Sequence, residues 1–377
     1  MYRHSLSTAN CSAPSRKRSQ KTTGNVLSRI ILTVFLLILL PALCTAQTLL
    51  SGSSSWPVAS GSDSDIPKGT YLLRDEDTVS FKEVWGFVNQ WSVSSTWNKD
   101  MPVTDVCLFA GDFNCYGEIV DMPKRSRIPD AGNARVHAVY ICDGTSLSHL
   151  VLNSEFGYRD RLIDEMVTSV VDFDGLMLDF ESIPTKDGDL FMDFVRILSN
   201  KLKGKKLFSI CVPARTGAVK NDIFPYTELA SLADRIFIMA YDQHWSGSAS
   251  GPIAGLDWSI RIANYAKKTI PHEKIIMGMP FYGRTWATDS GAGAWTYPGI
   301  NRILQDEEIP EVTYDKGSPT FSYTTEVSVT GYYNDAWSVF MLSKQYEQAG
   351  ISSVGFWRIG QEDPSFWEHL NITPEGN

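Results

Sequence analysis

Eight short apolar runs recur along the chain, and segments with a helical pattern lie between most of them. Val, Ile and Phe dominate these runs, which is typical of strands that are buried on both faces. Strands that alternate with helices predict an α/β fold whose parallel strands close into a (β/α)8 barrel, the TIM barrel. The first intervals are too short for full helices. The predicted strands are VWGFVNQ from Val84, DVCLFAG from Asp105, VHAVYIC from Val136, GLMLDFE from Gly175, LFSICVP from Leu207, RIFIMAY from Arg235, KIIMGMPF from Lys274 and SVGFWRI from Ser353.

Helical periodicity is clearest in three of the intervening segments. RDRLIDEMVTSVV and the segment from Leu190 to Leu202 repeat their apolar residues at helical spacing. DWSIRIANYAKKTI is the third predicted helix, with Asp257 placed to cap it.

The last interval between strands, from Phe281 to Ser353, is much longer than the others. Within it TFSYTTEVSVTGYY, Thr320 to Tyr333, alternates as strands do and predicts antiparallel hairpins. We therefore expect a small α+β insertion between strands 7 and 8, at about residues 286–333. It would form one wall of a cleft on the catalytic face of the barrel.

The amino-terminal segment predicts export. Basic residues precede the apolar run IILTVFLLILL, and CTA before Gln47 has the form of a cleavage site after Ala46. We expect a signal peptide at 1–46, a flexible Ser/Gly-rich linker at 47–66 and the catalytic barrel at 67–377. An uncleaved membrane anchor is one alternative. A lipid-attached form is another, although Leu43 before Cys44 fits it poorly. The predicted location is periplasmic, cell-surface or secreted.

The composition limits the kinds of molecule that the chain is expected to bind. A formal net charge of −9 argues against a general nucleic-acid binder, which needs a basic face. Eleven Trp fit a carbohydrate-contacting surface, although Trp also fills large cores. The chain has no CxxC or HExxH pattern, so we expect neither a metal nor a cofactor. We also expect a monomer, with free buried thiols at Cys107, Cys142 and Cys211.

Two carboxylates end the fourth predicted strand. Alternate residues of a strand face the same side, so Asp179 and Glu181 share one face, which in a barrel is the lumen. They lie at the carboxyl end, where barrel active sites form. Burying both would cost several kcal/mol unless they were paired, so the bland alternative is an ion pair with an Arg of a neighbouring strand. Their Cα atoms would lie about 6.5–7 Å apart, and the two do not obviously straddle a scissile bond.

Four motifs in order support a resemblance. DGLMLDFE, Asp174 to Glu181, resembles the DGxDxDxE signature of glycoside hydrolase family 18, which contains chitinases, chitobiases and peptidoglycan-cleaving N-acetylglucosaminidases. IMAYD resembles the family's Met-x-Tyr-Asp strand, MGMPFYGRTW its seventh strand, and GFWRIGQEDP carries the Trp of its last strand. Together they cover roughly Val84 to Trp367. The stretches WRIGQEDPSFW and DQHWSGS look most like an exported bacterial branch.

The resemblance implies a role for each matching residue. Glu181 would be the general acid and base, and Asp179 would hold the substrate acetamido group, which attacks the anomeric carbon in place of a protein carboxylate. The other implied contacts are Tyr241 to the acetamido oxygen, Asp242 to sugar hydroxyls, Met239 on the floor, Trp357 under the sugar ring, and Tyr282, Arg284 and Trp286 near the cleft. Core packing or loop capping would also explain several of these. Trp91 and Trp245 are further candidate stacking surfaces.

One position departs from the signature, because its middle Asp is Met177 here. Some branches that act on peptidoglycan also lack that Asp. The resemblance therefore implies a retaining glycosidase for N-acetylglucosamine-containing glycans, either peptidoglycan or chitin. The alternative is a catalytically silent glycan-binding protein on the same fold. Such members usually lose the motif Glu, which is present here.

Overall fold

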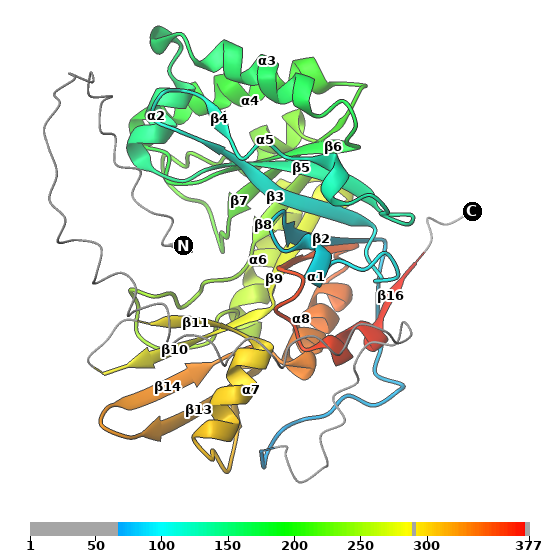
Figure 1. Cartoon of the computed structure of the whole chain (residues 1–377), viewed down its shortest axis with the longest axis vertical. Coiled ribbons are helices and arrows are strands. Elements are labelled where there is room, and N and C mark those ends of the chain that lie inside the picture. Colours follow the sequence, from blue (N-terminus) through cyan, green and yellow to red (C-terminus); the bar gives the residue numbers. More distant parts are fainter. Residues whose placement is uncertain (1–66, 289–291, 374–377) are drawn as a thin grey trace, which may run out of the picture. The chain divides into compact units, whose positions relative to one another are not determined.

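The computed structural model describes residues 67–288 and 292–373 (Figure 1). The predicted signal peptide, its cleavage after Ala46 and the linker at 47–66 lie outside the described residues.

Eight parallel strands form a closed barrel, as predicted, because the first strand pairs with both the second and the last. All eight runs identified in the sequence are strands. A short ninth strand, β4 (Ile119–Val120), pairs antiparallel with the end of β3. In barrel order the strands are β2 (Glu83–Asn89), β3 (Asp105–Phe113), β5 (Arg135–Cys142), β6 (Gly175–Phe180), β7 (Leu207–Pro213), β8 (Arg235–Met239), β9 (Ile275–Pro280) and β15 (Ser353–Trp357).

The helices follow the predicted pattern with one correction. Only α1 lies between β2 and β3, and a hairpin with a short 3-10 turn separates β3 from β5, so the early intervals are short as expected. Asp257 does not cap α6. Gly255 occupies the N-cap, and Asp257 lies in the first turn, where its charge suits the helix dipole. The helices are α1 (Val93–Thr96), α2 (Thr145–Leu152), α3 (Arg159–Ser169), α4 (Gly188–Leu202), α5 (Tyr226–Leu232), α6 (Leu256–Thr269), α7 (Tyr297–Asp306) and α8 (Ala336–Gln348). The 3-10 turns are η2 (Arg125–Arg127), η3 (Ser154–Phe156), η4 (Thr185–Asp187), η5 (His272–Lys274) and η6 (Pro364–His369).

An α+β lobe is inserted between β9 and β15, as predicted. Its antiparallel sheet has the order β11-β10-β14-β13-β12, and β13 and β14 form the expected hairpin. The lobe begins at Tyr282, earlier than the expected residue 286, because β10 follows β9 almost directly. Figure 1 shows the sheet in yellow to orange with α7 beside it. The strands are β10 (Tyr282–Ala287), β11 (Gly293–Thr296), β12 (Thr313–Asp315), β13 (Ser318–Thr324) and β14 (Ser328–Tyr332).

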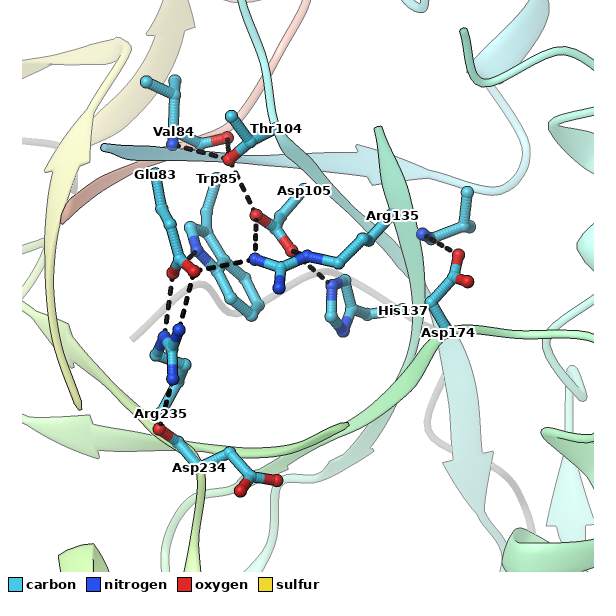
Figure 2. Close-up of polar contacts among 11 residues, drawn as sticks. Glu83, Val84, Trp85, Thr104, Asp105, Arg135, His137, Asp174, Asp234 and Arg235 are labelled. Atoms are coloured by element: carbon cyan, nitrogen blue, oxygen red, sulfur yellow. Dashed lines mark hydrogen bonds and ion pairs between the residues drawn. The ribbon is translucent and has the colours of Figure 1, made fainter. Parts of the chain in front are cut away.

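A charged network closes the amino-terminal end of the barrel (Figure 2). Glu83, Asp105, Arg135 and Arg235 are each the first residue of a barrel strand, so parallel pairing brings them to the same end. Glu83 accepts hydrogen bonds from Arg135 at 2.8 Å and from Arg235 at 2.7 and 2.9 Å. Arg135 also contacts Asp105 at 2.7 Å. Active sites of such barrels lie at the opposite, carboxyl end of the strands, so this network contributes to stability rather than to chemistry.

The first Asp of the signature lies at this same end. Asp174 precedes β6, and its carboxylate accepts a hydrogen bond from the backbone N–H of Val136 at 2.7 Å. Asp234 does the same for the N–H of Phe208 at 2.8 Å. These carboxylates satisfy backbone donors where neighbouring strands begin. Asp174 is therefore a structural residue, at the opposite end of β6 from Asp179.

The thiols of Cys107, Cys142 and Cys211 are buried and free, as predicted. Two further short strands, β1 (Val79–Phe81) and β16 (Leu370–Ile372), pair in parallel, one just before the first barrel strand and the other near residue 373.

Candidate active site

Asp179 and Glu181 lie at the carboxyl end of β6. Asp179 is 4% exposed, and its Oδ1 has no hydrogen-bond partner among the described residues. Glu181 follows the strand and is half-buried. Its backbone N–H donates to the carbonyl of Cys142 at 2.8 Å, so the β5–β6 pairing continues to this residue. Within the part of the chain that the structure describes, Asp179 makes no ion pair with an Arg, which the purely structural alternative required.

Burial keeps both carboxyls from ionising readily. Burial, followed by the charge of Glu181, raises the pKa of Asp179 well above its usual range, and a hydrogen bond with the Cys211 thiol offsets part of this. Burial and the neighbouring carboxylate of Asp143 raise the pKa of Glu181. A half-exposed carboxyl with a raised pKa is suited to proton donation near neutral pH.

Tyr241 and Met239 reach the same region from β8. Met239 ends that strand, Tyr241 lies two residues later, and both are partly buried. Burial and the nearby Cys211, Asp179 and Glu181 raise the pKa of the Tyr241 hydroxyl, which therefore stays a neutral donor. The carboxyls and the phenol thus lie within electrostatic range of one another. The structure thus brings Asp179, Glu181 and Tyr241 together at the carboxyl end of the barrel.

Asp242 links the barrel to the lobe. It adopts a left-handed backbone conformation with φ of 57°, which Asp tolerates better than most residues. Its carboxylate accepts hydrogen bonds from the Tyr282 hydroxyl at 2.5 Å and from Arg284 at 3.0 to 3.2 Å. Tyr282 and Arg284 come from β10 and are almost fully buried. Three residues that the sequence placed near the cleft separately therefore form one cluster.

Aromatic side chains line the lumen at the carboxyl end of the last strand. Trp357 ends β15 and is 8% exposed. Its ring packs edge-on against Phe109 at 4.7 Å and lies 5.1 Å from Phe87. The peptide bond between Trp357 and Arg358 is cis. Trp357 thus has the contacts of a packed wall residue and also a small accessible edge.

The remaining tryptophans differ in setting. Trp286 is partly buried on β10, and its indole N–H donates to the carbonyl of Trp245 at 3.3 Å. This contact ties β10 to the loop after β8. Trp245 is 43% exposed, and Trp91, which follows β2, is 60% exposed with the guanidinium of Arg127 5.5 Å from its ring. Exposed aromatic rings of this kind can stack on sugars.

Met177 occupies the place of the signature's middle Asp and is fully buried in β6. Its strand neighbours in register are Val139 and Ser209. An apolar side chain beneath Asp179 removes one negative neighbour but also gives no polar solvation. This agrees with burial being the largest cause of the raised pKa of Asp179.

Two residues at the site were missed by the sequence analysis. Asp143 directly follows β5, and Ser182 follows Glu181. The Ser182 hydroxyl donates to Asp143 at 2.7 Å. The signal was present, because VHAVYICD places an acid at the carboxyl end of a predicted strand, as in β6. It was not used because no motif of the resemblance includes it.

Among the described residues, no group of three or more His, Cys, Asp or Glu side chains is arranged to hold a metal ion. In the same parts of the chain, none of the helices combines the length and apolar character that a membrane span requires.

Known proteins resemble this chain in sequence. A family model described as glycosyl hydrolases family 18 matches residues 146–362. The uncharacterized glycosylase YvbX of Bacillus subtilis is 27% identical over 248 residues, which are 62% of this chain and 71% of that protein. The cortical fragment-lytic enzyme of Bacillus anthracis is 27% identical over 215 residues, 52% of this chain and 50% of that protein. The chain thus spans about half the length of that second relative.

Solved structures share the fold. The Bacillus cereus spore cortex-lytic enzyme SleL matches with a TM-score of 0.68 at 19% identity, over 79% of this chain and 76% of that chain. A chitinase from Chromobacterium violaceum matches with a TM-score of 0.66 at 20% identity, over 76% and 96%. The family model covers more than half of the chain and includes β6 with both carboxyls. The chain therefore belongs to family 18 of the glycosyl hydrolases and is a glycoside hydrolase.

Proposed function

We propose that this glycoside hydrolase cleaves β-linked glycans that contain N-acetylglucosamine, with retention of configuration and with the substrate acetamido group as nucleophile. The observation that carries the proposal is the pair Asp179 and Glu181, which lie at the carboxyl end of β6 and both have a raised pKa. Glu181 is the more accessible of the two and is the general acid. Asp179 is too buried to act as a second acid on solvent-borne substrate and instead positions the acetamido group.

The reaction then has two steps. In the first, Glu181 gives its proton to the glycosidic oxygen as the C–O bond breaks, and the acetamido oxygen bonds to the anomeric carbon. Asp179 accepts a hydrogen bond from the acetamido N–H, and the Tyr241 hydroxyl donates to the acetamido oxygen. In the second, the Glu181 carboxylate takes a proton from water, which attacks the anomeric carbon and opens the oxazolinium ring. Two inversions give net retention.

The surrounding residues bind the sugar. Asp242, held by Tyr282 and Arg284, offers a carboxylate oriented for sugar hydroxyls. Trp357 lies beneath the ring at the reacting bond, Met239 forms part of the floor, and Trp286 borders the cleft from the lobe. General acid catalysis contributes about 10²–10⁴-fold, and positioning of the internal nucleophile supplies several kcal/mol more.

Peptidoglycan is the substrate we favour, with export across the membrane as part of the proposal. The support is the cortical fragment-lytic and cortex-lytic names of the Bacillus relatives, together with the amino-terminal signal pattern. Chitin is the alternative polymer, since a chitinase shares the fold. A second candidate function, glycan binding without turnover, is favoured by Met177 alone, because typical chitinases have an Asp at that position.

The test compares the wild type with Glu181→Gln on purified peptidoglycan and on a β-1,4-linked N-acetylglucosamine tetramer. Products are identified by mass spectrometry, and the anomeric configuration is followed by NMR. We expect retained configuration and a loss of turnover in Glu181→Gln of at least about 10²-fold with binding kept. Glu155→Gln, an exposed glutamate on η3, is the matched control and should keep full activity.

An analogue with a hydroxyl in place of the N-acetyl group is the sharpest substrate, because it lacks the nucleophile. No cleavage of the analogue supports the mechanism. Turnover comparable to that of the natural substrate would mean that a protein carboxylate attacks, and it would remove the role given to Asp179. Binding of both glycans by the wild type without any product would establish the silent binding protein instead.

A further inference from the structure

Asp143 lies beside Glu181 at the carboxyl ends of two neighbouring strands. Strands β5 and β6 pair in parallel with Ile141 opposite Asp179 and Cys142 opposite Phe180. The hydrogen bond from the N–H of Glu181 to the carbonyl of Cys142, at 2.8 Å, continues that pairing. Asp143 is the first residue after β5 and Glu181 the first after β6, so the same register would put their backbones about 4.8 Å apart. Asp143 is also close enough to Glu181 and Asp179 for its charge to raise the pKa of both carboxyls.

Hydrogen bonds hold these two segments together. The Ser182 hydroxyl donates to Oδ1 of Asp143 at 2.7 Å, and Ser182 takes a left-handed conformation with φ of 53°. A serine rarely adopts that conformation, which costs of order 1 kcal/mol and persists only where surrounding contacts fix it. From the other side, the Ser148 hydroxyl donates to the carbonyl of Glu181 at 3.2 Å. The Asp143 carboxylate is therefore fixed next to Glu181 although it is solvent-exposed.

The surroundings of Glu181 contain several other ionisable groups. Asp179 shares its strand and is neutralised by burial, whereas Asp242 is paired with Arg284. Cys211 and Tyr241 have raised pKa values and stay neutral near pH 7. Among the described residues, Asp143 differs from these groups because it is exposed and makes no ion pair with an Arg. Among the described residues, the ionisable groups around Glu181 are Asp179 from β6, Asp143 after β5, Cys211 from β7, Tyr241 and Asp242 after β8, and Arg284 from β10, which pairs with Asp242.

We propose that Asp143 is a positioning residue for Glu181, and that its negative charge, held in place by Ser182, keeps the Glu181 carboxyl protonated until the substrate arrives. The proposal rests on the general-acid role given to Glu181 in the proposed function. Two like charges at this separation disfavour the second ionisation. Once Glu181 has given up its proton, the same repulsion makes it a stronger base toward water. The negative charge of Asp143 thus assists both steps of a retaining reaction, in which Glu181 acts first as an acid and then as a base.

The test is a titration of Glu181 in the full chain, which needs no substrate. Protein labelled with ¹³C at the glutamate side-chain carboxyl gives one resonance per residue, and the Glu181 signal is the one missing from Glu181→Gln. We expect Asp143→Asn, which keeps the oxygen that accepts from Ser182, to lower the titration midpoint by about 0.5–2 pH units. That range follows from Coulomb's law for charges about 6 Å apart at effective dielectric constants between about 80 and 20.

Asp172→Asn is the matched control, because Asp172 is an exposed carboxylate before β6, at the opposite end of the strand from Glu181. It should leave the midpoint unchanged. Ser182→Ala keeps the negative charge of Asp143 but removes the hydrogen bond that holds it beside Glu181. This variant should lower the Glu181 midpoint by less than Asp143→Asn does. An unmoved midpoint in Asp143→Asn, or an equal shift in Asp172→Asn, would overturn the proposal.

The salt dependence of the Glu181 midpoint is a second test, and it uses only the wild-type protein. At about 1 M ionic strength the Debye length falls to about 3 Å, so the exposed charge of Asp143 is screened. The wild-type midpoint should fall toward that of Asp143→Asn as salt is added, and a midpoint that does not change with salt would count against the proposal.

In an active enzyme, the alkaline limb of the kcat/KM profile should move with the midpoint. If the wild type turns over neither glycan, the titration still decides the role of Asp143 and the proposed function alone fails.

Discussion

At the scale of single residues, Asp179 is held at an energetic disadvantage. Its carboxyl is 4% exposed, one oxygen lacks a hydrogen-bond partner among the described residues, and its pKa is well above the usual range. A carboxyl whose folded pKa is raised stays protonated in the folded state while the unfolded chain ionises. Folding stability therefore falls as pH rises from about 4 toward the folded pKa.

Asp179→Asn should for this reason stabilise the fold while abolishing activity. The amide is neutral at every pH, so the variant does not lose the folding stability that the wild type loses above about pH 4. We expect a gain of roughly 0.5–2 kcal/mol at pH 7, the usual size when a site residue is relieved of strain, and almost no difference near pH 4. Urea unfolding at several pH values measures this. A gain that is the same at pH 4 and pH 7 would show that ionisation is not the cause, and Asp172→Asn serves as the control.

Strand alternation was enough to predict that Asp179 and Glu181 share a face, because it depends only on local backbone geometry. The resemblance added Tyr241, Asp242 and Trp357 from other strands. Neither strand alternation nor the resemblance predicted the hydrogen bonds of Asp242 with Tyr282 and Arg284, since these join residues that lie 40 and 42 positions apart in the sequence. Asp143 was not predicted from the sequence, because its proposed role depends on its spatial neighbour Glu181 and not on the residues next to it in the chain.

At the scale of elements, the two ends of the barrel use charge differently. The residues after β5, β6 and β8 bring several acids together, of which Asp242 pairs with Arg284. The amino ends of β2, β3, β5 and β8 instead combine Glu83 and Asp105 with Arg135 and Arg235. Burial alone would raise the pKa of Glu83, but hydrogen bonds from Arg235 and Arg135 outweigh it and lower that pKa. This end stabilises the barrel.

Glu83→Gln should therefore destabilise the protein without touching catalysis. Two guanidinium groups lose their shared anion, which costs about 3–5 kcal/mol for fully buried partners. Because 38% of the Arg135 side chain is exposed, we expect about 2–3 kcal/mol. The lowered pKa gives a contribution that is present above about pH 4.3 and lost as pH falls toward the folded value, so the difference from wild type should shrink below pH 4. Thermal unfolding between pH 3 and 7 measures it.

The control for this prediction is Glu165→Gln, which breaks an exposed pair with Arg161 on α3 and should change stability little. Equal effects of the two substitutions would mean that the network at the amino-terminal end adds nothing beyond a surface contact.

All eight barrel strands were predictable because each is a continuous apolar run buried on both faces. The helix α7 and the short strands β12 and β16 were not, since three to ten residues in a mixed pattern carry little signal on their own. The cap of α6 was assigned to the wrong residue for a related reason: a Gly that is free to adopt the N-cap conformation shows no side-chain pattern.

At the scale of the whole described chain, the segment from Pro67 to Phe81 connects the lobe to the barrel. The N–H of Lys68 donates to the carbonyl of Pro310, and the N–H of Val312 donates back to Lys68. Tyr71 stacks on Trp337 of α8 with the ring centroids 4.7 Å apart. Further along, β1 pairs with β16. No local pattern reveals these contacts, because each joins the segment to residues more than two hundred positions away.

Tyr71 is the residue where lobe and barrel contacts of this segment meet. Besides Trp337, its ring lies 4.7 Å from that of Tyr314 in β12, and its backbone N–H donates to the Tyr314 hydroxyl at 3.3 Å. The Tyr314 hydroxyl in turn donates to Asp335, at 2.5 Å, and Asp335 caps α8 through the N–H of Ser338. A chain of contacts thus runs from the segment through the lobe to the first turn of a barrel helix.

Tyr71→Ala should loosen the lobe without unfolding the barrel. Aromatic pairs contribute about 0.5–1.5 kcal/mol each beyond the buried area, and Tyr71 is 54% exposed, so we expect a loss of about 1 kcal/mol. Hydrogen–deuterium exchange should rise in 67–74 and in β12 and stay unchanged in β5 and β6. Tyr71→Phe is the matched control, because both aromatic contacts use the ring and the hydrogen bond uses the backbone. If Phe behaves like Ala, or if exchange rises equally in the barrel strands, the segment does not join lobe and barrel through Tyr71.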